Sequence, residues 1–595
     1  MCRIAGIISK ELNINDIQRK VIVMCDTLKH GGPDDEGIFI AEDMGLVFGH
    51  RRLSIIDLSS KGHQPMADVK EKARITFNGE IYNYPELKNE LLQLGAQFKS
   101  NSDTEVIIQA YLYWGMASFA KLRGMFAFAL YDTEKALTYL VRDTMGVKPL
   151  YYHVQGGQLS FASEVTALHE AGIATTINKN WVIRFLAFGH VPEPETTLVD
   201  VLSLPKGNLL CWDHANSSYT IATYNDTPVT RYITDITLAK KALNDGLRVA
   251  IKRQLIADAP IGVFLSGGVD SSLVTLLANQ YKQQDLKTIS IFFNEKAYDE
   301  RAYQQEVFNK IQGQKFTHLV QRQDFDESLP AILRAMDMPT TDGVNSWFIS
   351  KYARQDGVKA VLSGLGADEL FGGYPSFNRI DYIKYLKSIP PALLKLTNYL
   401  GADQYKKVNY LSNDHTYADY LFLRGLFAPA EIAAILNCDE KEVYTVLFSD
   451  IDIPNPGITN KEKAAWFENN LYMQNQLLRD TDVMSMSHGL EVRVPFLDED
   501  FQQTVNSIAP DIRFDKHQPK KILVDAFKDI LPPSVWNRPK MGFSFPLQQW
   551  MAQHEEIGAE SLYKSKKARS VIKAFKNNKV HWSKVFALYQ IQKHA

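Results

Sequence analysis

One seven-residue stretch, 266–272, limits the folds open to this chain more than any other. It reads Ser-Gly-Gly-Val-Asp-Ser-Ser, follows an apolar run at 261–265 and precedes a helix-like run at 273–277. This order predicts a buried strand, a tight turn and a helix. Two adjacent glycines let the backbone approach a ligand closely, and the amides at a helix start favour an anion. The stretch therefore predicts a phosphate-binding turn.

The acidic residue in this turn, Asp270, indicates a metal ion. A carboxylate repels bare phosphate unless a divalent cation lies between them. No Lys-Ser or Lys-Thr pair follows, so the turn is not a Walker loop. The alternative is an ordinary serine–glycine turn that opens a helix, and such turns are common. The complete string after a buried strand is much rarer, and it favours a pyrophosphate-binding turn with a magnesium ligand.

The stretch resembles the PP-loop of ATP pyrophosphatases, which cleave ATP between the α and β phosphates and adenylate a substrate. The resemblance implies ATP as a substrate, Mg²⁺ as its ion and a carboxylic acid as the activated group. The turn residues that it places at the nucleotide are Ser266, Gly267, Gly268, Asp270, Ser271 and Ser272.

Length and charge limit the classes of protein that fit. A chain of 595 residues is too long for one core, so two to four domains are expected. Lys and Arg total 66 against 68 Asp and Glu, which argues against a nucleic-acid-binding surface. No apolar run is long enough to span a membrane, and no signal core is visible. Four widely spaced cysteines predict free thiols in a cytoplasmic protein.

Cys2 directly follows the initiator methionine. Removal of that methionine would make Cys2 the N-terminal residue. Its α-amino group, with a pKa of about 7.7–8.0, would then be partly neutral and able to accept the thiol proton. A cysteine at this position by chance is the alternative. The sequence therefore offers Cys2 as a nucleophile that carries its own base.

Strand-like runs alternate with polar clusters over the first 200 residues, which predicts layered sheets covered by helices. The polar clusters lie at 30–34, 49–54, 78–83 and 101–105. Together with Cys2, they resemble the N-terminal-nucleophile glutaminase domain of class II amidotransferases. Placed before a PP-loop, they resemble the glutamine-hydrolysing asparagine synthetase family. The resemblance implies an α+β domain with αββα layers, then an α/β parallel-sheet synthetase domain with a helix-rich C-terminal part.

The resemblance assigns roles in the glutaminase. The side-chain amide of Asn78 and the backbone N–H of Gly79 match oxyanion-hole positions. Arg52 matches the residue that binds the glutamine α-carboxylate. Asp103 matches the residue that holds the α-ammonium, and Glu80 lines the same site. The alternatives are a surface ion pair for Arg52 and a hairpin turn for Asn78 and Gly79.

The domains are expected at 2–212 for the glutaminase and 237–595 for the synthetase, with a polar connector at 213–236. Apolar strands that alternate with helices predict a parallel, doubly wound sheet, which binds ligands at the carboxyl ends of its strands. Asp368 follows a third strand, so it is a candidate second magnesium ligand beside Asp270; a charged helix start is the alternative. By resemblance, Ile291, Ser363 and Gly364 lie near the nucleotide. Lys520 matches a catalytic lysine near the phosphates whose charge would stabilise the adenylation transition state; a solvated surface lysine is the alternative.

The chain departs from the family pattern at two positions. Gly31 stands where the family has the arginine of His-Arg-Gly-Pro-Asp, which bears on glutaminase efficiency or on its coupling to the second site. Leu365 stands where well-known asparagine synthetases have an acidic residue. An apolar residue cannot orient an ammonium group or act as a base, so this change bears on the identity of the acceptor.

The resemblance implies a two-site enzyme with an internal passage for ammonia. Cys2 would form a thioester with glutamine, and ammonia would displace AMP from a β-aspartyl adenylate to give asparagine, glutamate, AMP and pyrophosphate. The alternatives are an amidotransferase that modifies a peptide, sugar or secondary metabolite, a β-lactam-synthetase-like cyclase, and a scaffold with relic sites. A homodimer is a further expectation, and neither nucleic acid nor membrane is expected as a partner.

Overall fold

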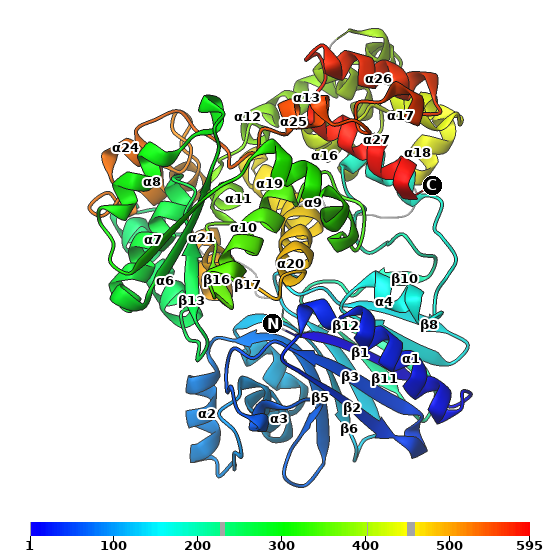
Figure 1. Ribbon diagram of the computed structural model, residues 1–595, viewed down its shortest axis with the longest axis vertical. Helices are drawn as coiled ribbons and strands as arrows, with labels where there is room; N and C mark the ends of the chain where they lie inside the picture. The colour runs from blue at the N-terminus through cyan, green and yellow to red at the C-terminus, as the bar shows by residue number, and fades with distance from the viewer. Residues whose placement is uncertain (1, 226–231, 402, 449–458, 595) are drawn as a thin grey trace.

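The computed structural model describes residues 2–225, 232–401, 403–448 and 459–594. The chain forms two domains, and its N-terminus lies between them (Figure 1). The first domain, drawn from blue to cyan, contains two β-sheets with helices outside them. The second, drawn from green to red, contains one sheet within a large set of helices.

Both sheets of the first domain are six-stranded and antiparallel. The first has the order β10 (Val201–Ser203), β8 (Tyr151–Gln155), β9 (Gln158–Ala162), β1 (Arg3–Ile8), β3 (Leu46–Arg52) and β2 (Asp35–Ala41). The second has the order β12 (Ser218–Thr223), β11 (Asn208–Asp213), β7 (Leu137–Arg142), β6 (Gly124–Asp132), β5 (Ala73–Ile81) and β4 (Met66–Ala67). The helices of this part are α1 (Ile14–Thr27), α2 (Tyr84–Gln93), α3 (Asp103–Trp114), α4 (Val165–Glu170) and α5 (Trp181–Phe188).

Strand β1 shows why its sequence is apolar throughout. Side chains alternate across a strand, so Ala5 and Ile7 face helix α1 while Ile4 and Ile8 face the second sheet. Helices α2 and α3 cover the outer face of that second sheet. The layers therefore run helix, sheet, sheet, helix, and the predicted αββα arrangement is confirmed.

The connector expected at 213–236 begins later in the structure. Strand β12 pairs with β11 along its whole length, so the second sheet extends to Thr223. Every residue of β12 is exposed, because it is the edge strand of the sheet. Its polar composition is that of an edge strand, which explains why the sequence resembles a loop. Part of the expected connector, 226–231, lies outside the described residues.

The second domain contains the predicted parallel sheet, with five strands that are all parallel. The order is β15 (Gln314–Leu319), β14 (Lys287–Phe292), β13 (Ile261–Phe264), β16 (Ala360–Leu362) and β17 (Glu491–Arg493). The helices nearest this sheet in sequence are α6 (Ile236–Gln254), α7 (Val269–Lys282), α8 (Arg301–Phe308), α9 (Arg322–Ala335), α10 (Val344–Gln355), α11 (Ala367–Phe371), α20 (Arg479–Met486), α21 (Glu499–Asn506), α22 (Pro510–Arg513), α23 (Lys521–Ala526) and α24 (Pro533–Trp536).

The helix-rich part expected after residue 378 is also present. Its helices are α12 (Ser376–Arg379), α13 (Asp381–Leu386), α14 (Pro391–Lys395), α15 (Asp403–Lys406), α16 (Thr416–Arg424), α17 (Pro429–Leu436), α18 (Glu440–Phe448), α19 (Asn460–Phe467), α25 (Leu547–Gln553), α26 (Lys566–Lys576) and α27 (Trp582–His594). A π-helix, Glu468–Leu478, joins α19 directly to α20. None of the helices among the described residues is long and apolar enough to span a membrane.

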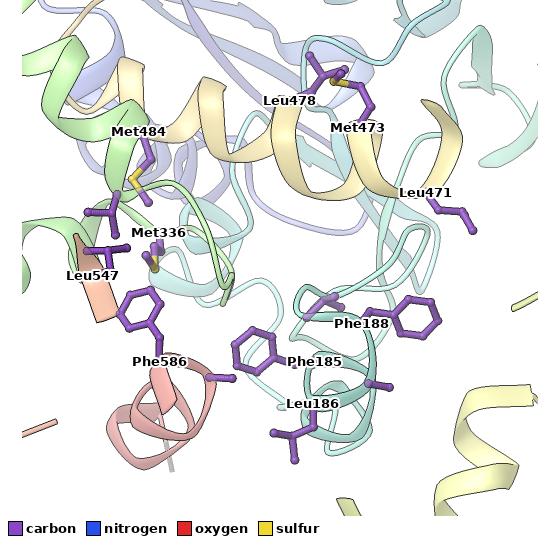
Figure 2. Packing of buried hydrophobic residues seen from close by; sticks show 14 of the residues in the cluster. Phe185, Leu186, Phe188, Met336, Leu471, Met473, Leu478, Met484, Leu547 and Phe586 are labelled. Atoms are coloured by element: carbon purple, nitrogen blue, oxygen red, sulfur yellow. The ribbon is translucent and has the colours of Figure 1, made fainter. Parts of the chain in front are cut away.

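Helix α5 precedes the last strands of the first domain in sequence but packs into the core of the second. Phe185, Leu186 and Phe188 lie in one apolar cluster with side chains such as Leu478 and Phe586 (Figure 2). The carbonyls of residues 186 and 187 accept hydrogen bonds at 3.1 and 2.7 Å from backbone amides at 427 and 426. The two domains are therefore interlocked and not merely adjacent.

Candidate active sites

Cys2 lies immediately before strand β1 with its thiol buried. Its Sγ donates a long hydrogen bond of 3.9 Å to the backbone oxygen of Leu53. Burial raises the pKa of the thiol to about 11. Because the thiolate is the nucleophilic form, attack at neutral pH requires a base beside this sulfur. The backbone nitrogen of Cys2 becomes such a base, an α-amine, once the preceding methionine is removed.

Asn78, on strand β5, contacts that nitrogen. Cys2 N donates to Asn78 Oδ1 at 3.2 Å. The other end of the amide, Nδ2, is buried and has no hydrogen-bond partner among the residues described. An unpaired buried donor is costly, and a ligand oxygen beside Cys2 could accept a hydrogen bond from this one. Gly79, the second residue predicted for an oxyanion hole, follows Asn78 in the same strand.

Arg52 ends strand β3 close to the thiol. Its charge, together with that of Glu80, acts on the pKa of Cys2. The guanidinium is buried and donates to the backbone oxygens of Asp57 at 2.5 Å and Ser59 at 3.1 Å. Arg52 is therefore not the surface ion pair that was the alternative.

Asp103, the first residue of helix α3, lies near Glu80. Its Oδ2 accepts a hydrogen bond of 2.9 Å from the backbone N–H of Ile81, and its charge acts on the pKa of Glu80. Burial raises the pKa of Asp103 to about 6. The structure thus brings the predicted glutaminase residues into one neighbourhood, although they are separated by up to a hundred positions in the chain.

In the second domain, the predicted strand, turn and helix at 261–277 are present as β13 and α7. Hydroxyl groups hold the turn: the Oγ atoms of Ser266 and Ser271 are 2.9 Å apart, and Gly268 N donates to Ser266 Oγ at 3.3 Å. The Oγ of Ser272 is buried and has no hydrogen-bond partner within the described ranges.

A second turn, after strand β16, packs directly on the first. A Cβ at Gly364 would lie 2.7 Å from the backbone nitrogen of Ser271 and 2.8 Å from the carbonyl carbon of Asp270. Only glycine permits this approach. The two turns therefore form one wall, as expected for the carboxyl ends of neighbouring parallel strands.

Three charged side chains meet at this wall. The Nζ of Lys520 lies 2.5 Å from Asp270 Oδ2 and 2.5 Å from Asp368 Oδ1. Burial alone would lower the pKa of Lys520, but the two carboxylates outweigh it and raise that pKa. Lys520 itself has a left-handed backbone with a φ of 60°, which is uncommon for a residue other than glycine.

The carboxylate pair fits a magnesium ion that is also held by phosphate. Asp270 Oδ1 is buried and has no hydrogen-bond partner among the residues described. No group of three or more His, Cys, Asp or Glu side chains in the described part of the chain could hold a metal ion. Because Mg²⁺ commonly takes one or two carboxylates and completes its shell with phosphate oxygens, two carboxylates are enough.

A cavity of about 740 Å³ opens in front of the two turns. Eight predicted residues line it: Ser266, Gly268, Asp270, Ser271, Ser363, Gly364, Asp368 and Lys520. Gly267 and Ser272 are not among its lining residues, and Ile291 lines a small recess beside Ser266 instead. The volume lies within the range of small-molecule sites.

The two candidate sites are joined by buried charges. Glu80, beside the predicted oxyanion hole, lies 3.4 Å from the Nη2 of Arg493 on strand β17. Arg493 also pairs with Glu491 at 2.5 Å and donates to the backbone oxygen of Gln254 at 2.7 Å. A residue of the first site is therefore in direct contact with the sheet that carries the second.

Comparison with known proteins agrees with this arrangement. The glutamine amidotransferase domain profile matches residues 1–225, and the asparagine synthase profile matches residues 242–580, more than half of the chain. The chain belongs to the asparagine synthetase family. It is similar to asparagine synthetase [glutamine-hydrolyzing] 1 of Bacillus subtilis, with 30% identity over 565 residues that cover 93% of this chain and 88% of that protein. It is also similar to amidase chry2 of Gibberella zeae, with 27% identity over 584 residues that cover 88% and 84%.

This asparagine synthetase-family chain has further cations at its cavity, for which the sequence suggested no role. Arg538 donates to the backbone oxygen of Gly267 at 3.0 Å and to Glu300 at 2.6 Å. The Nζ of Lys540 lies 2.8 Å from Asp368 Oδ1. Both belong to the loop Arg-Pro-Lys-Met-Gly-Phe. Its two basic residues close to a glycine are the sequence feature that could have indicated a role in the site.

Leu365 stands where well-known asparagine synthetases have an acidic residue, and its surroundings in the structure include apolar side chains. Leu365 lines the cavity and packs against the apolar cluster of the second domain. Aromatic side chains line the cavity too, and among them are one each from α5, α16, the π-helix and α27: Phe188, Tyr420, Tyr472 and Trp582. The one further arginine among the described lining residues, Arg424, is paired with Glu468 at 2.7 Å.

Proposed function

We propose that this asparagine synthetase-family enzyme transfers ammonia from glutamine to an adenylated carboxylate, and that aspartate is the first candidate acceptor, with asparagine as product. One observation carries the proposal. A buried N-terminal thiol beside an unpaired amide donor, and a PP-loop cavity with two carboxylates, lie in one chain and are joined by buried charges.

At the first site, the α-amine of Cys2 accepts the thiol proton, and Sγ attacks the side-chain carbonyl carbon of glutamine. The oxyanion that forms is stabilised by Asn78 Nδ2 and the N–H of Gly79. The protonated α-amine returns the proton to the departing nitrogen, collapse to the thioester expels ammonia, and water then releases glutamate and restores the thiol. Arg52 holds the α-carboxylate of glutamine, and Asp103 holds its ammonium group.

At the second site, the serines and glycines of 266–272 bind the phosphates of ATP, and the acceptor carboxylate attacks the α-phosphorus with loss of pyrophosphate. Mg²⁺ held by Asp270 and Asp368 would supply positive charge against the phosphate oxygens. Lys520 contacts the same two carboxylates, and its ammonium group supplies charge next to them. Ammonia then attacks the acyl carbon, and AMP leaves.

A different acceptor acid is the second candidate, and Leu365 favours it. The cavity has an apolar residue at the acidic position of the family and several aromatic side chains in its wall. Such a wall suits a larger or less polar acid, in the broad class of peptides, sugars and secondary metabolites. The relative named as an amidase is consistent with substrates other than aspartate within this family.

Pyrophosphate release with glutamine, ATP and a panel of acids tests both candidates. Aspartate-dependent release, with asparagine found by mass spectrometry, supports the first. Release with another acid but not with aspartate supports the second. A Cys2→Ala variant supplied with ammonium chloride serves as the control, because it separates acceptor choice from glutamine hydrolysis. No release with any acid contradicts the proposed function.

A further inference from the structure

Arg3, the residue after the nucleophile, is completely buried between the two domains. Its Nε lies 2.8 Å from Glu164 Oε1 of the first domain, and its Nη1 lies 2.6 Å from Asp482 Oδ2 on helix α20 of the second. Lys148 and His30 complete the cluster, at 2.9 Å from Asp482 and 3.0 Å from Glu164. Arg3 is thus the central cation of a buried charge cluster that spans the domain interface.

This cluster lies next to Gly31, one of the two positions at which the chain departs from its family. A Cβ at Gly31 would lie 2.7 Å from the Cγ of Arg3 and 2.9 Å from its Nε. The side chain of an arginine at position 31 would therefore clash with the side chain of Arg3. The two side chains exclude each other, so the glycine at 31 and the arginine at 3 belong together.

The cluster is also connected to the synthetase cavity through neighbouring residues of helix α20. Thr481 lines that cavity, and Asp482 is the next residue of α20. On the other side, Arg3 is covalently joined to Cys2. A displacement of α20 at the cavity would therefore reach the nucleophile through one ion pair and two peptide links.

We propose that Arg3 is a positioning residue that couples the two sites, and that it fills from position 3 the space of the arginine missing at position 31. The inference rests on the proposed function, since it assumes hydrolysis of glutamine at Cys2. Arg3 touches neither substrate. It fixes the start of strand β1 against helix α20, so that the thiol is held in its attacking position when the second site is filled.

The test compares Arg3→Met with Arg123→Met. Arg123 also makes an interdomain ion pair, 2.8 Å from Asp500, but it touches neither β1 nor α20. The measured quantity is glutamate released per pyrophosphate, with the acid that the panel identifies. We expect a ratio close to one in the wild type and in Arg123→Met, and a rise of fivefold or more in Arg3→Met. Ammonia-dependent pyrophosphate release should stay within twofold in both variants.

A compensating exchange makes the test specific. Gly31→Arg alone should raise the ratio because of the clash, whereas Arg3→Ser combined with Gly31→Arg should bring it back to within twofold of the wild type. If Arg3→Met does not fold, Arg3→Lys keeps the charge but cannot bridge both carboxylates, and it should still raise the ratio.

A second readout needs no acceptor acid. The rate at which a diazoketone analogue of glutamine alkylates Cys2 should change at least threefold with ATP and Mg²⁺ in the wild type, and not in Arg3→Met. An unchanged ratio in the Arg3 variants, an equal rise in Arg123→Met, or a wild-type alkylation rate that ignores ATP would overturn the role of Arg3. The absence of glutamine hydrolysis or of pyrophosphate release in the wild type would instead overturn the proposed function.

Discussion

Glu80 of the first domain and Arg493 of the second are both buried, and they lie 3.4 Å apart. Arg493 is the cation shared by Glu80 and Glu491. Burial, together with the charge of Glu491, raises the pKa of Glu80 well above its usual value. Arg493 therefore supplies the positive charge that stabilises the buried carboxylates of Glu80 and Glu491 at the domain interface.

Replacing this cation should destabilise the whole protein. We expect Arg493→Met to lower the free energy of unfolding by about 3–5 kcal/mol, because the buried carboxylates lose the cation that they share. Arg123→Met removes partly exposed interdomain ion pairs with Asp500 and Glu499 and should cost less than Arg493→Met, because water still reaches these charges. Urea unfolding of both variants near neutral pH measures the difference, and equal losses would contradict the role assigned to Arg493.

The base at Cys2 can be removed without touching the thiol. Burial raises the pKa of that thiol to about 11, so at neutral pH the thiol loses its proton only if the α-amine accepts it. Inserting an alanine between Met1 and Cys2 converts the amine into an amide. We expect glutamine hydrolysis to fall by more than about 10³-fold, as for loss of the nucleophile itself in Cys2→Ala.

Both Cys2 variants should retain synthesis from added ammonia, since the second site is built from other residues. Comparable loss of the ammonia-dependent reaction would show that the two sites are not separate. Full glutamine hydrolysis in the insertion variant would show that another group accepts the thiol proton.

The carboxylate pair of the second domain gives the opposite pattern. Asp270→Asn or Asp368→Asn should lower pyrophosphate release on the order of 10²-fold, because each removes half of the proposed magnesium site and one contact of Lys520. Glutamine hydrolysis should change little. The magnesium concentration that gives half-maximal release should rise in both variants, and unchanged magnesium dependence would argue against this assignment.

Glu431, on helix α17, should make the stability of the C-terminal helices pH-dependent. It lies 2.9–3.4 Å from the Nζ atoms of Lys406, Lys567 and Lys584. Burial alone would raise the pKa of Glu431, but Lys584 and Lys567 in particular outweigh it and lower that pKa to about 2. Since the pKa is lowered on folding, the stabilisation is present above the ordinary glutamate pKa and is lost as the pH falls towards 2.

We therefore expect Glu431→Gln to destabilise this region on the order of 3 kcal/mol near pH 7, and by less near pH 3. Hydrogen exchange in helices α26 and α27, measured at both pH values, reports the change. Gln590, also buried on α27, carries no charge and donates to the backbone oxygen of Thr340, so it offers a control as Gln590→Leu, whose effect should not vary with pH. A Glu431 effect of equal size at both pH values would contradict the ion-pair explanation.

The local parts of both sites could be predicted from the sequence. The turn at 266–272 depends on neighbouring residues, and its strand and helix lie where the pattern placed them. The position of Lys520 between two carboxylates could not be predicted, because it pairs with Asp270 across 250 positions of sequence. The link from Arg3 to Asp482 spans 479 positions, and only the folded chain reveals it.

Elements at the domain boundary were harder to predict for a different physical reason. Strand β12 is polar because it is an exposed edge, so its composition resembles that of a loop. Helix α5 is apolar almost throughout, and such a segment gives no sign of which core will bury it.

Because helix α5 packs in the second domain, the boundary between the domains in the sequence does not coincide with their boundary in the structure. Phe188 belongs to the wall of the synthetase cavity, although it precedes strands β10–β12 of the amidotransferase sheets. A fragment that starts at the connector would lack part of that wall and would expose the apolar surface that α5 covers. An exchange of the first domain at the connector would therefore also replace Phe188 in the wall of the second-domain cavity.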